Sequence, residues 1–238
     1  MKELFRVIES PRTCSYLPNE TASLEFRAIA AMRPEEYGDL LARGYRRFGW
    51  QVFRPACSSC TQCRSLRVAV PQFALNASDR RVLRKNEHVR VELHPLFVTR
   101  EHVELYNRYQ AFMHEHRGWE LRTATISSYR DSFLSGEAEL GRQWLFFEAD
   151  RLIGVALMDQ APEAISLVYF FHDPRWRSRS PGRFSILKQL LYAKEQGLRY
   201  AYLGYWIERC GSMNYKNRFR PHEILAEYVP DEGTPVWI

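Results

Sequence analysis

Three strand-like runs follow one another in the second half of the chain: Gln143-Trp-Leu-Phe-Phe-Glu148, Leu152-Ile-Gly-Val-Ala-Leu-Met-Asp159 and Ala164-Ile-Ser-Leu-Val-Tyr-Phe-Phe171. Each is short and rich in the aromatic and branched apolar residues that strands favour. The dipeptide Asp150-Arg151 suits the tip of a hairpin between the first two runs. We therefore predict antiparallel strands at the centre of a mixed α/β fold.

The segments around these strands indicate the arrangement of helices. Two helices are predicted upstream, over 99–115 and 127–135, from their apolar spacing and their end signals. Downstream, a loop rich in Ser, Pro and Arg at 173–183 precedes a predicted helix at 184–196 and a strand at 199–206. This order is typical of an N-acetyltransferase-like (GNAT) acyl-transfer domain, by analogy of fold alone.

The first hundred residues have a different character and are expected to form a smaller domain. A helix is predicted over 34–48, because apolar residues recur there at helical spacing after a proline suited to the first turn. Strands are predicted at 66–70 and 89–93 from their alternation. The predicted organisation is an N-terminal domain at 1–98 and an acyl-transfer domain at 99–238.

Composition limits the class of protein. The chain has 238 residues, of which 45% are apolar and 26% charged, so it is long enough and apolar enough to bury a core. Lys and Arg number 34 against 28 Asp and Glu, a net charge of +6 that favours a polyanionic partner such as nucleic acid. Without a long uncharged apolar stretch or a signal-peptide pattern, we expect a cytoplasmic protein that does not bind membranes.

The cysteines form the most specific local pattern. Cys57, Cys60 and Cys63 are separated by two residues each, a spacing that brings three thiolates within reach of one metal ion or cluster. Cys14 is the candidate for a fourth ligand, since Cys210 lies in the other half of the chain. We predict a structural zinc ion or iron–sulfur cluster. The alternative is that these thiols are small, partly buried residues on a tight loop.

Two groups of basic residues are candidates for contact with phosphates. One lies on a short helix predicted to begin at Ser78, and the other lies in the loop before the helix at 184–196. The alternative is an ordinary solvated surface. The candidate side chains are Arg80, Arg81, Arg84 and Lys85 on the helix and Arg175, Arg177, Arg179 and Arg183 in the loop.

The loop Arg179-Ser-Pro-Gly-Arg183 precedes a helix, so its backbone amides and the helix N-terminus could bind a phosphate or a developing oxyanion. A coenzyme A-dependent acetyltransferase would bind pyrophosphate here. However, Gly182 is the single glycine of the loop and Pro181 has no N–H to donate. The loop therefore disfavours a simple coenzyme A-dependent N-acetyltransferase.

The C-terminal segments Tyr202–Glu208 and Met213–Pro221 mix aromatic rings with charged side chains. Aromatic rings at the end of a strand can line a pocket for an apolar group or a stacked base. The alternative is that they form the edge of the core with their polar tips in water.

Together these segments resemble the bacterial aminoacyl-tRNA protein transferases, in the aspartate/glutamate leucyltransferase branch of the arginyltransferase family. Tyr45, Phe48 and Trp50 depart from the usual pattern of that family's glycine–aromatic–arginine run. The matching segments are Cys14-Ser-Tyr16-Leu17-Pro18, Gly44–Gly49, Phe53-Arg54-Pro55, Ser78–Arg81, Tyr169–Pro174, Tyr202–Glu208 and Met213–Pro221.

This resemblance implies transfer of leucine from leucyl-tRNA to the N-terminal α-amine of proteins that begin with Asp or Glu, which marks those proteins for degradation. It implies no cofactor for the transfer itself. It also implies a cysteine-bearing N-terminal domain and a GNAT-like C-terminal domain. Three alternatives stay open: arginine as the donor amino acid, a coenzyme A-dependent N-acetyltransferase, and a non-catalytic, metal-containing RNA-binding protein.

The matching motifs supply candidate site residues. Asp173 or Glu208 is the predicted acceptor of the amine proton, and Tyr205 or Tyr215 is predicted to bond the oxyanion or a ribose hydroxyl. An arginine donor would need a carboxylate in the donor pocket. The predicted cations for the acceptor carboxylate are Arg46, Arg47 and Lys216. The predicted walls of the leucyl pocket are Tyr169, Phe171 and Trp206. The predicted tRNA contacts are Arg80, Arg81, Arg84, Lys85, Arg175 and Arg183.

Overall fold

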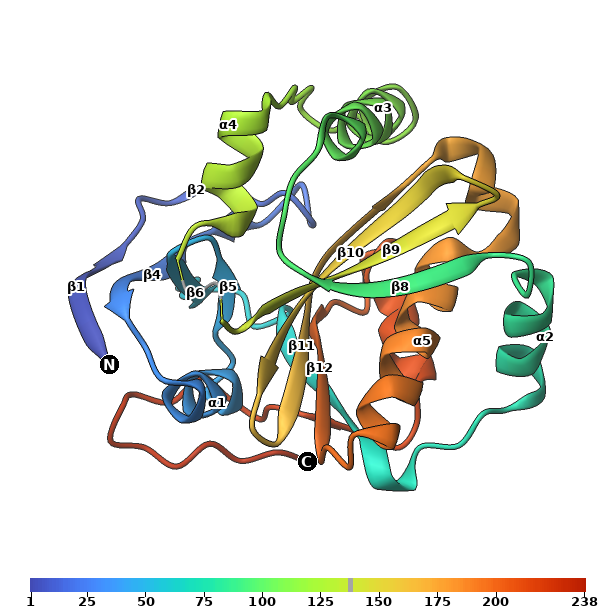
Figure 1. The fold of residues 1–238 in the computed structure, drawn as a ribbon. Helices are drawn as coiled ribbons and strands as arrows, with labels where there is room; N and C mark the ends of the chain where they lie inside the picture. Colours follow the sequence, from blue (N-terminus) through green and yellow to red (C-terminus); the bar gives the residue numbers. More distant parts are fainter. Residues whose placement is uncertain (137–138) are drawn as a thin grey trace.

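The computed structural model describes residues 1–136 and 139–238 and contains two main sheets (Figure 1). The larger sheet has the strand order β13-β7-β12-β11-β10-β9-β8. Its strands are β7 (Arg64–Ala69), β8 (Arg90–Pro95), β9 (Gly141–Glu148), β10 (Arg151–Ala161), β11 (Ala164–His172), β12 (Tyr200–Trp206) and β13 (His222–Ile224).

The smaller sheet is antiparallel throughout and has the order β1-β4-β6-β5. A separate two-stranded pairing joins β2 (Arg12–Thr13) to β3 (Thr21–Ala22). The strands of the smaller sheet are β1 (Lys2–Ile8), β4 (Leu24–Ala31), β5 (Arg46–Phe48) and β6 (Gln51–Pro55).

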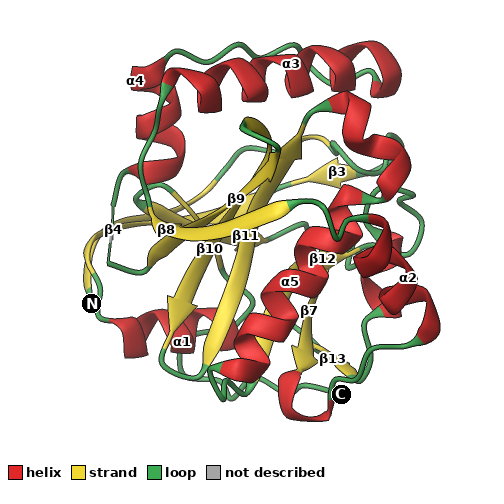
Figure 2. Ribbon diagram, turned by 45° about the vertical axis from the view of Figure 1, so that its right-hand side comes forward, coloured by secondary structure: helices red, strands yellow, loops and turns green. Residues whose placement is uncertain are grey.

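Helices cover both faces of the larger sheet (Figure 2). They are α1 (Pro34–Ala42), α2 (Ala77–Lys85), α3 (Arg100–Arg117), α4 (Ile126–Tyr129) and α5 (Pro181–Glu195). A π-helical turn at Arg130–Leu134 continues α4, and 3-10 turns occupy Val70–Gln72, Pro174–Arg179 and Asn214–Arg218. No helix in the described part of the chain is long and apolar enough to cross a membrane.

Alternate residues of β10 enter different hydrophobic clusters, because successive side chains of a strand point to opposite faces. Ala156 and Met158 belong to the cluster that contains α5, whereas Val155 and Leu157 belong to the cluster that contains α3 and α4. All four side chains are buried. The sheet is therefore a central layer with a core on each side.

The pairing of β11 with β12 is short, and this decides where a site can form. The two strands are parallel and pair only from Ala164–Ser166 to Tyr200–Tyr202. Beyond this point β12 stays paired with β7, while β11 continues beside β10. The strands separate, and the gap between them is open to side chains from other elements.

The predicted α/β class and the order of elements in the second half are confirmed. The predicted helix over 34–48 is too long: α1 ends at Ala42, and Gly44 adopts the left-handed φ of 83°. Residues Arg46–Phe48 then form β5. The predicted cap Ser78 is also wrong, since Asn76 caps α2 in a reciprocal pair with Asp79.

The larger sheet combines strands from both sides of the predicted domain boundary at residue 98. Strands β7, β8 and β9–β13 form one hydrogen-bonded sheet. The predicted helix at 127–135 is present as α4 and the π turn, which begin after a Thr125 cap. π turns are common at functional sites, and this one borders a cavity described below.

Candidate active site

A cavity of about 460 Å³ opens where β11 and β12 separate. β11 contributes Leu167–Phe170 to its wall, and β12 contributes Leu203 and Tyr205. We call it the cationic cavity, because Arg46, Arg47 and Lys216 also line it. The gap between the strands thus brings charged side chains from distant parts of the sequence together.

Arg46 occupies the gap itself. Its guanidinium donates hydrogen bonds to the carbonyl oxygens of Leu167 and Val168, which lie beyond the paired part of β11. On the opposite strand, Gly204 has a φ of 80°, and a Cβ at that position would overlap the guanidinium. The glycine therefore makes room for Arg46, and Arg46 in turn satisfies backbone acceptors that the separation leaves unpaired.

Lys216 lies on the 3-10 turn that follows β12 and lines the same cavity. Its Nζ donates to the carbonyl oxygen of Tyr205 at 2.9 Å. Burial is the largest cause that lowers the pKa of this ammonium to about 7; the nearby Arg46 contributes to the shift, whereas Cys210 and Cys63 oppose it. The lysine therefore exchanges its proton readily near neutral pH.

Arg47 also lines the cavity, but its charge is already paired. Its Nε donates to Asp159 Oδ2 at 3.0 Å, and both side chains are buried. Tyr37 donates a further hydrogen bond to the same carboxylate at 2.8 Å. Arg47 therefore anchors β5 to β10.

The cationic cavity combines positive charge with an apolar wall. None of the described residues that line it is an Asp or Glu, whereas Arg46 and Lys216 present a guanidinium and an amine. This arrangement attracts a carboxylate and offers an apolar group a place away from water. The apolar wall includes Met113, Leu157, Leu167, Phe170, Ile186 and Leu203.

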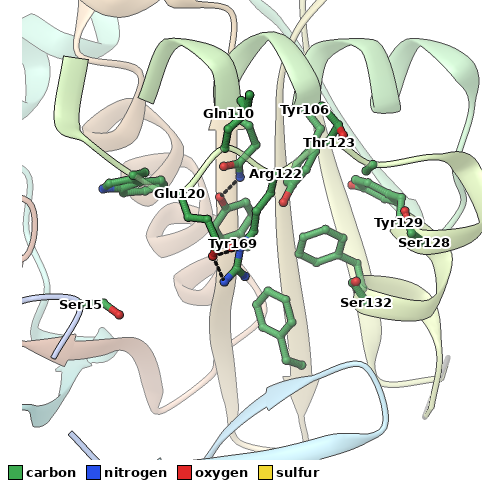
Figure 3. A pocket seen from close by; sticks show the side chains of 15 residues that line it. Ser15, Tyr106, Gln110, Glu120, Arg122, Thr123, Ser128, Tyr129, Ser132 and Tyr169 are labelled. Atoms are coloured by element: carbon green, nitrogen blue, oxygen red, sulfur yellow. Dashed lines mark hydrogen bonds and ion pairs between the residues drawn. The ribbon is translucent and has the colours of Figure 1, made fainter. Parts of the chain in front are cut away.

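Figure 3 shows the residues that line a second cavity, of about 700 Å³. The two share Phe48, Trp119 and Tyr169 as lining residues. We call it the aromatic cavity, because Tyr106 of α3 and Tyr129 of α4 also line it. Its walls are mainly aromatic rings and hydroxyls, and its two charged lining residues, Glu120 and Arg122, pair with each other at 2.9 Å.

The two predicted proton acceptors lie outside both cavities. Asp173 is buried at the start of a 3-10 turn, where it accepts a hydrogen bond from the Arg175 backbone at 2.9 Å and pairs with Arg151 at 3.1 Å. Its role in this structure is to hold a turn. Glu208 is exposed beyond the end of β12. Lys216 and His172 are ionisable groups that line the cationic cavity and can accept a proton, and burial lowers the pKa of both.

The predicted aromatic residues divide between cavity and core. Tyr169, Tyr205 and Tyr215 line the cationic cavity, although the Tyr205 hydroxyl donates to the Phe53 carbonyl at 3.2 Å and so points to β6. Phe171 lies fully buried in the core beneath α3.

Trp206 is also buried and lines neither cavity. Its indole donates to the Asn214 carbonyl at 3.0 Å, and Arg64 lies over its ring. Phe171 and Trp206 therefore do not form the walls of a leucyl pocket in this structure.

Two family profiles match the chain. The profile described as arginine-tRNA-protein transferase, N terminus, matches residues 12–81, and the corresponding C-terminus profile matches residues 101–226. The chain belongs to the arginine-tRNA-protein transferase family. The N-terminal profile contains Arg46, and the C-terminal profile contains Tyr169 and Lys216, so the cationic cavity lies between the two matched regions.

Curated relatives of this transferase are similar over nearly their whole length. An aspartate/glutamate leucyltransferase of Helicobacter hepaticus is 37% identical, covering 95% of this chain and 94% of the relative. An aspartate/glutamate leucyltransferase of Teredinibacter turnerae is 39% identical, covering 90% and 88%.

Among solved structures, L-PGS from Bacillus licheniformis matches with a TM-score of 0.48 and 12% identity, covering 73% of this chain and 50% of that one. A GNAT-family acetyltransferase from Staphylococcus aureus Mu50 matches with a TM-score of 0.39 and 17% identity, covering 59% and 90%.

The cysteines of this transferase lie near one another but are not arranged around a metal position. Burial, together with smaller contributions from Cys14, Cys57 and Cys60, raises the pKa of the Cys63 thiol to about 12. The Cys57 sulfur instead contacts the Ser23 backbone. Within residues 1–136 and 139–238, no three His, Cys, Asp or Glu side chains are placed to hold a metal ion.

The side chains as placed therefore do not fit the predicted zinc ion or iron–sulfur cluster. The predicted metal site of Cys14, Cys57, Cys60 and Cys63 stays a prediction, which metal analysis of the purified protein can test.

The predicted tRNA contacts also separate into two groups. On α2, all four cations are exposed: Arg80, Arg81, Arg84 and Lys85. In contrast, Arg175 pairs with Asp173 at 3.2 Å, and Arg183 pairs with Asp79 at 2.7 Å, which fixes α2 to the start of α5. The α2 cations are the ones that remain available to a phosphate backbone.

The residues that sequence reasoning missed are those of the aromatic cavity. Tyr106, Gln110 and Met113 fall on one stripe of the helix at 99–115, and that pattern indicates a core-facing side. In the structure this stripe faces both cavities. The signal available in the sequence was that two residues of this otherwise apolar stripe, Tyr106 and Gln110, carry polar groups.

Proposed function

We propose that this transferase moves leucine from leucyl-tRNA to the N-terminal α-amine of proteins that begin with Asp or Glu. The observation that carries the proposal is the cationic cavity, where Arg46 and Lys216 face an apolar wall without a described Asp or Glu in the lining. The curated relatives with the name aspartate/glutamate leucyltransferase support it. The reaction would take place in the cytoplasm, on proteins marked in this way for degradation.

The chemistry needs little beyond alignment, because an aminoacyl ester is already activated. The acceptor amine attacks the ester carbonyl carbon, a C–N bond forms, and the carbonyl becomes a tetrahedral oxyanion. As the carbonyl is restored, the C–O bond to the tRNA ribose breaks and the ribose oxygen takes a proton. The protein must hold the two reactants together and move the proton that the amine loses. No further cofactor takes part.

Arg46 is the proposed binding group for the acceptor side-chain carboxylate. Its backbone hydrogen bonds to Leu167 and Val168 hold the guanidinium at the wall of the cavity. A guanidinium can present two parallel donors to a carboxylate, so it suits both Asp and Glu. Among the described residues, no carboxylate forms an ion pair with Arg46.

Lys216 is the proposed acceptor of the amine proton. With its pKa lowered to about 7, first by burial and then by Arg46, a large fraction of the side chain is neutral near pH 7. An N-terminal ammonium has an ordinary pKa of about 7.7–8.0, so the transfer is close to balanced. The nearby Tyr215 phenol, whose pKa is raised by burial, stays protonated and is the proposed hydrogen-bond donor to the oxyanion or a ribose hydroxyl.

The apolar wall favours leucine over arginine as the donor amino acid. A guanidinium brought into this cavity would meet Arg46 and Lys216 without a described Asp or Glu in the lining to offset them. Contact with the tRNA itself is proposed for the exposed α2 cations. They form a sequence-independent phosphate contact, whose strength depends on salt.

The experiment measures transfer of radiolabelled amino acids from leucyl-, arginyl- and phenylalanyl-tRNA to peptides that begin with Asp, Glu, Arg or Ala. The expected result is leucine on Asp and Glu peptides alone. Arginine on the same peptides would overturn the proposed donor and leave the acceptor site standing. No transfer from any donor, by a folded protein, would overturn the proposed function in favour of coenzyme A chemistry or RNA binding without catalysis.

A further inference from the structure

The acceptor nitrogen has to lose two protons in the proposed reaction. It arrives as an ammonium, and Lys216 is the proposed acceptor of the first proton. After the amine has attacked the ester, the same nitrogen carries a positive charge and a second proton, while the ribose oxygen needs a proton in order to leave. Lys216 is itself an ammonium by then, so a second group has to move this proton.

The cationic cavity contains one further side chain that can both accept and donate a proton near neutral pH. The guanidinium groups of Arg46 and Arg47 stay protonated. Burial raises the pKa of every tyrosine in the described lining, so these phenols stay protonated as well: Tyr16, Tyr109, Tyr169, Tyr205 and Tyr215. Apart from Lys216, His172 is the remaining ionisable residue of that described lining.

The hydrogen bonding of His172 fixes which ring nitrogen can accept a proton. His172 is the last residue of β11, and its Nδ1 lies 2.9 Å from the carbonyl oxygen of Asp173. A carbonyl oxygen can only accept, so the neutral ring carries its hydrogen on Nδ1 and a lone pair on Nε2. Nε2 makes no hydrogen bond within residues 1–136 and 139–238. It is therefore available to a substrate proton.

Three aromatic rings pack around the imidazole. The Phe170 ring stacks on it with centroids 5.5 Å apart and planes inclined by 29°. The centroids of Tyr109 and Trp176 lie at 5.3 Å and 6.2 Å from that of His172. A ring held in this way needs little reorganisation before it transfers a proton.

The surroundings of His172 also suit both directions of transfer. Burial is the largest cause that lowers the pKa of this imidazole, and Arg177 contributes, whereas the carbonyl and the carboxylate of Asp173 oppose the shift. The ring is therefore neutral at pH 7 and can accept a proton. Once protonated, it is a stronger acid than an ordinary imidazolium, which favours delivery of the proton to a departing oxygen.

We infer that His172 is a catalytic residue that moves the second amine proton to the ribose oxygen of the leaving tRNA. This inference rests on the proposed function and adds the step that Lys216 cannot perform. Nε2 takes the proton from the positively charged nitrogen of the tetrahedral intermediate. As the carbonyl is restored and the C–O bond to the ribose breaks, Nε2 gives the same proton to the departing oxygen. The products are an amide, a ribose hydroxyl and a neutral imidazole, and the first proton leaves Lys216 to water.

The test compares His172→Gln with His116→Gln. His116 is exposed near the end of α3, where its Nδ1 lies 3.0 Å from the Phe112 carbonyl oxygen, and it lines neither cavity. His172→Gln should lower kcat about 50-fold, because a carboxamide forms hydrogen bonds but does not exchange a proton near neutral pH. The KM values for leucyl-tRNA and for the acceptor peptide should stay the same. His116→Gln should change neither kcat nor KM.

Two modified donors distinguish proton delivery from a structural role. In both, the terminal ribose lacks the hydroxyl next to the ester: one carries hydrogen there, and the other carries fluorine, which makes the departing hydroxyl more acidic. The loss of kcat in His172→Gln should be about tenfold smaller with the fluorine donor than with the hydrogen donor, because an acidic leaving group needs less help from an acid. A second variant, His172→Ala, should regain part of its kcat when imidazole is added, and His116→Ala should not respond.

A normal kcat in folded His172→Gln would overturn the role of His172 while the proposed function stands. Equal losses with the two modified donors would overturn it as well. If His172→Gln does not fold, a His172→Ala protein whose kcat imidazole leaves unchanged would have the same meaning. Absence of leucine transfer from leucyl-tRNA by the unaltered protein would overturn the proposed function, and this inference with it.

Discussion

Two adjacent cavities share three aromatic rings and differ in almost everything else. The cationic cavity forms where β11 and β12 separate, and Arg46 and Lys216 reach it from different elements. The aromatic cavity forms on the α3 and α4 side, where rings, hydroxyls and the Glu120–Arg122 ion pair line it. The comparison shows how one fold places two differently lined cavities side by side: diverging strands admit cations, whereas helices packed on the sheet supply rings.

The largest expected effect comes from removing the charge that defines the cationic cavity. Arg46→Met should lower kcat/KM for peptides that begin with Asp by about 100-fold, because a charge-assisted bidentate contact is lost. Peptides that begin with Asn should be poor acceptors for the unaltered protein and change little in the variant. Steady-state transfer assays with both peptides measure this.

Arg46→Lys is the matched control, since it keeps a cation and loses the planar fork. It should recover part of the activity on Asp peptides. Thermal unfolding of both variants distinguishes a change in the site from loss of the backbone contacts to Leu167 and Val168. A folded Arg46→Met protein that still prefers Asp over Asn would show that the acceptor carboxylate binds elsewhere.

Variants of Lys216 test whether this second cation of the cationic cavity accepts the proton of the acceptor amine. Burial and Arg46 lower its pKa to about 7, so below pH 7 the amine is protonated and cannot accept another proton. The kcat of the unaltered protein should fall as the pH drops below 7, and Lys216→Met should be about 30-fold slower at pH 7.5 with a flatter acid limb. The acceptor amine titrates in both proteins, so the difference between the two pH profiles reports Lys216.

Lys216→Arg separates proton transfer from charge. Arginine keeps the positive charge but stays protonated, so this variant should be as slow as Lys216→Met. Full recovery of kcat in Lys216→Arg would mean that the residue only binds a carboxylate.

Much of the fold could be predicted from the sequence because its strands carry local signals. The runs that became β9, β10 and β11 alternate or are continuously apolar, and hairpin residues separate them. The helix at 34–48 was predicted too long because Tyr45 and Phe48 continue a helical spacing. The left-handed Gly44 and pairing with β6 override that spacing, and neither is visible locally.

The site was harder to predict, since its residues meet through separation of strands. Arg46, Tyr169, Tyr205, Tyr215 and Lys216 were candidates from matching motifs, and all five line the cationic cavity. Phe171 and Asp173 were also candidates, but both are buried away from the cavity. Phe171 has the same alternation as Tyr169 but lies deeper in the core, and the buried Asp173 is held by arginines that are near it only in the folded chain.

The next prediction concerns the protein surface, where the exposed cations of α2 are the proposed contacts for tRNA. Arg81→Glu combined with Arg84→Glu should lower kcat/KM for leucyl-tRNA about tenfold at moderate salt and leave the KM for the acceptor peptide unchanged. The effect should shrink as salt rises. Filter binding and transfer assays across a salt series measure it.

Arg199 offers a control on another surface, where it pairs with Glu163 at 3.1 Å. Arg199→Glu with Lys188→Glu on α5 changes the net charge by the same amount without altering a residue of α2. Equal loss of tRNA use in both double variants would mean that overall charge, and not the α2 surface, attracts the tRNA.

Asp173 lies outside both cavities and should have the smallest effect on catalysis. Burial raises the pKa of this carboxyl, but hydrogen bonds and charge from Arg175 and Arg151 outweigh burial and hold the pKa below its ordinary value of 3.8. Asp173→Asn should therefore lower the free energy of unfolding by about 2 kcal/mol at pH 7, while kcat/KM per folded molecule changes less than twofold. Urea unfolding beside transfer assays measures both.

The pH dependence of that stability has a definite sign. A carboxyl whose pKa is depressed by folding stabilises the protein above its unfolded value and loses this contribution as the pH falls through the folded value. The difference between the unaltered protein and Asp173→Asn should thus be constant from pH 7 to pH 5 and shrink below about pH 4. A large loss of kcat without loss of stability would instead place Asp173 in the reaction and weaken the assignment of the proton to Lys216.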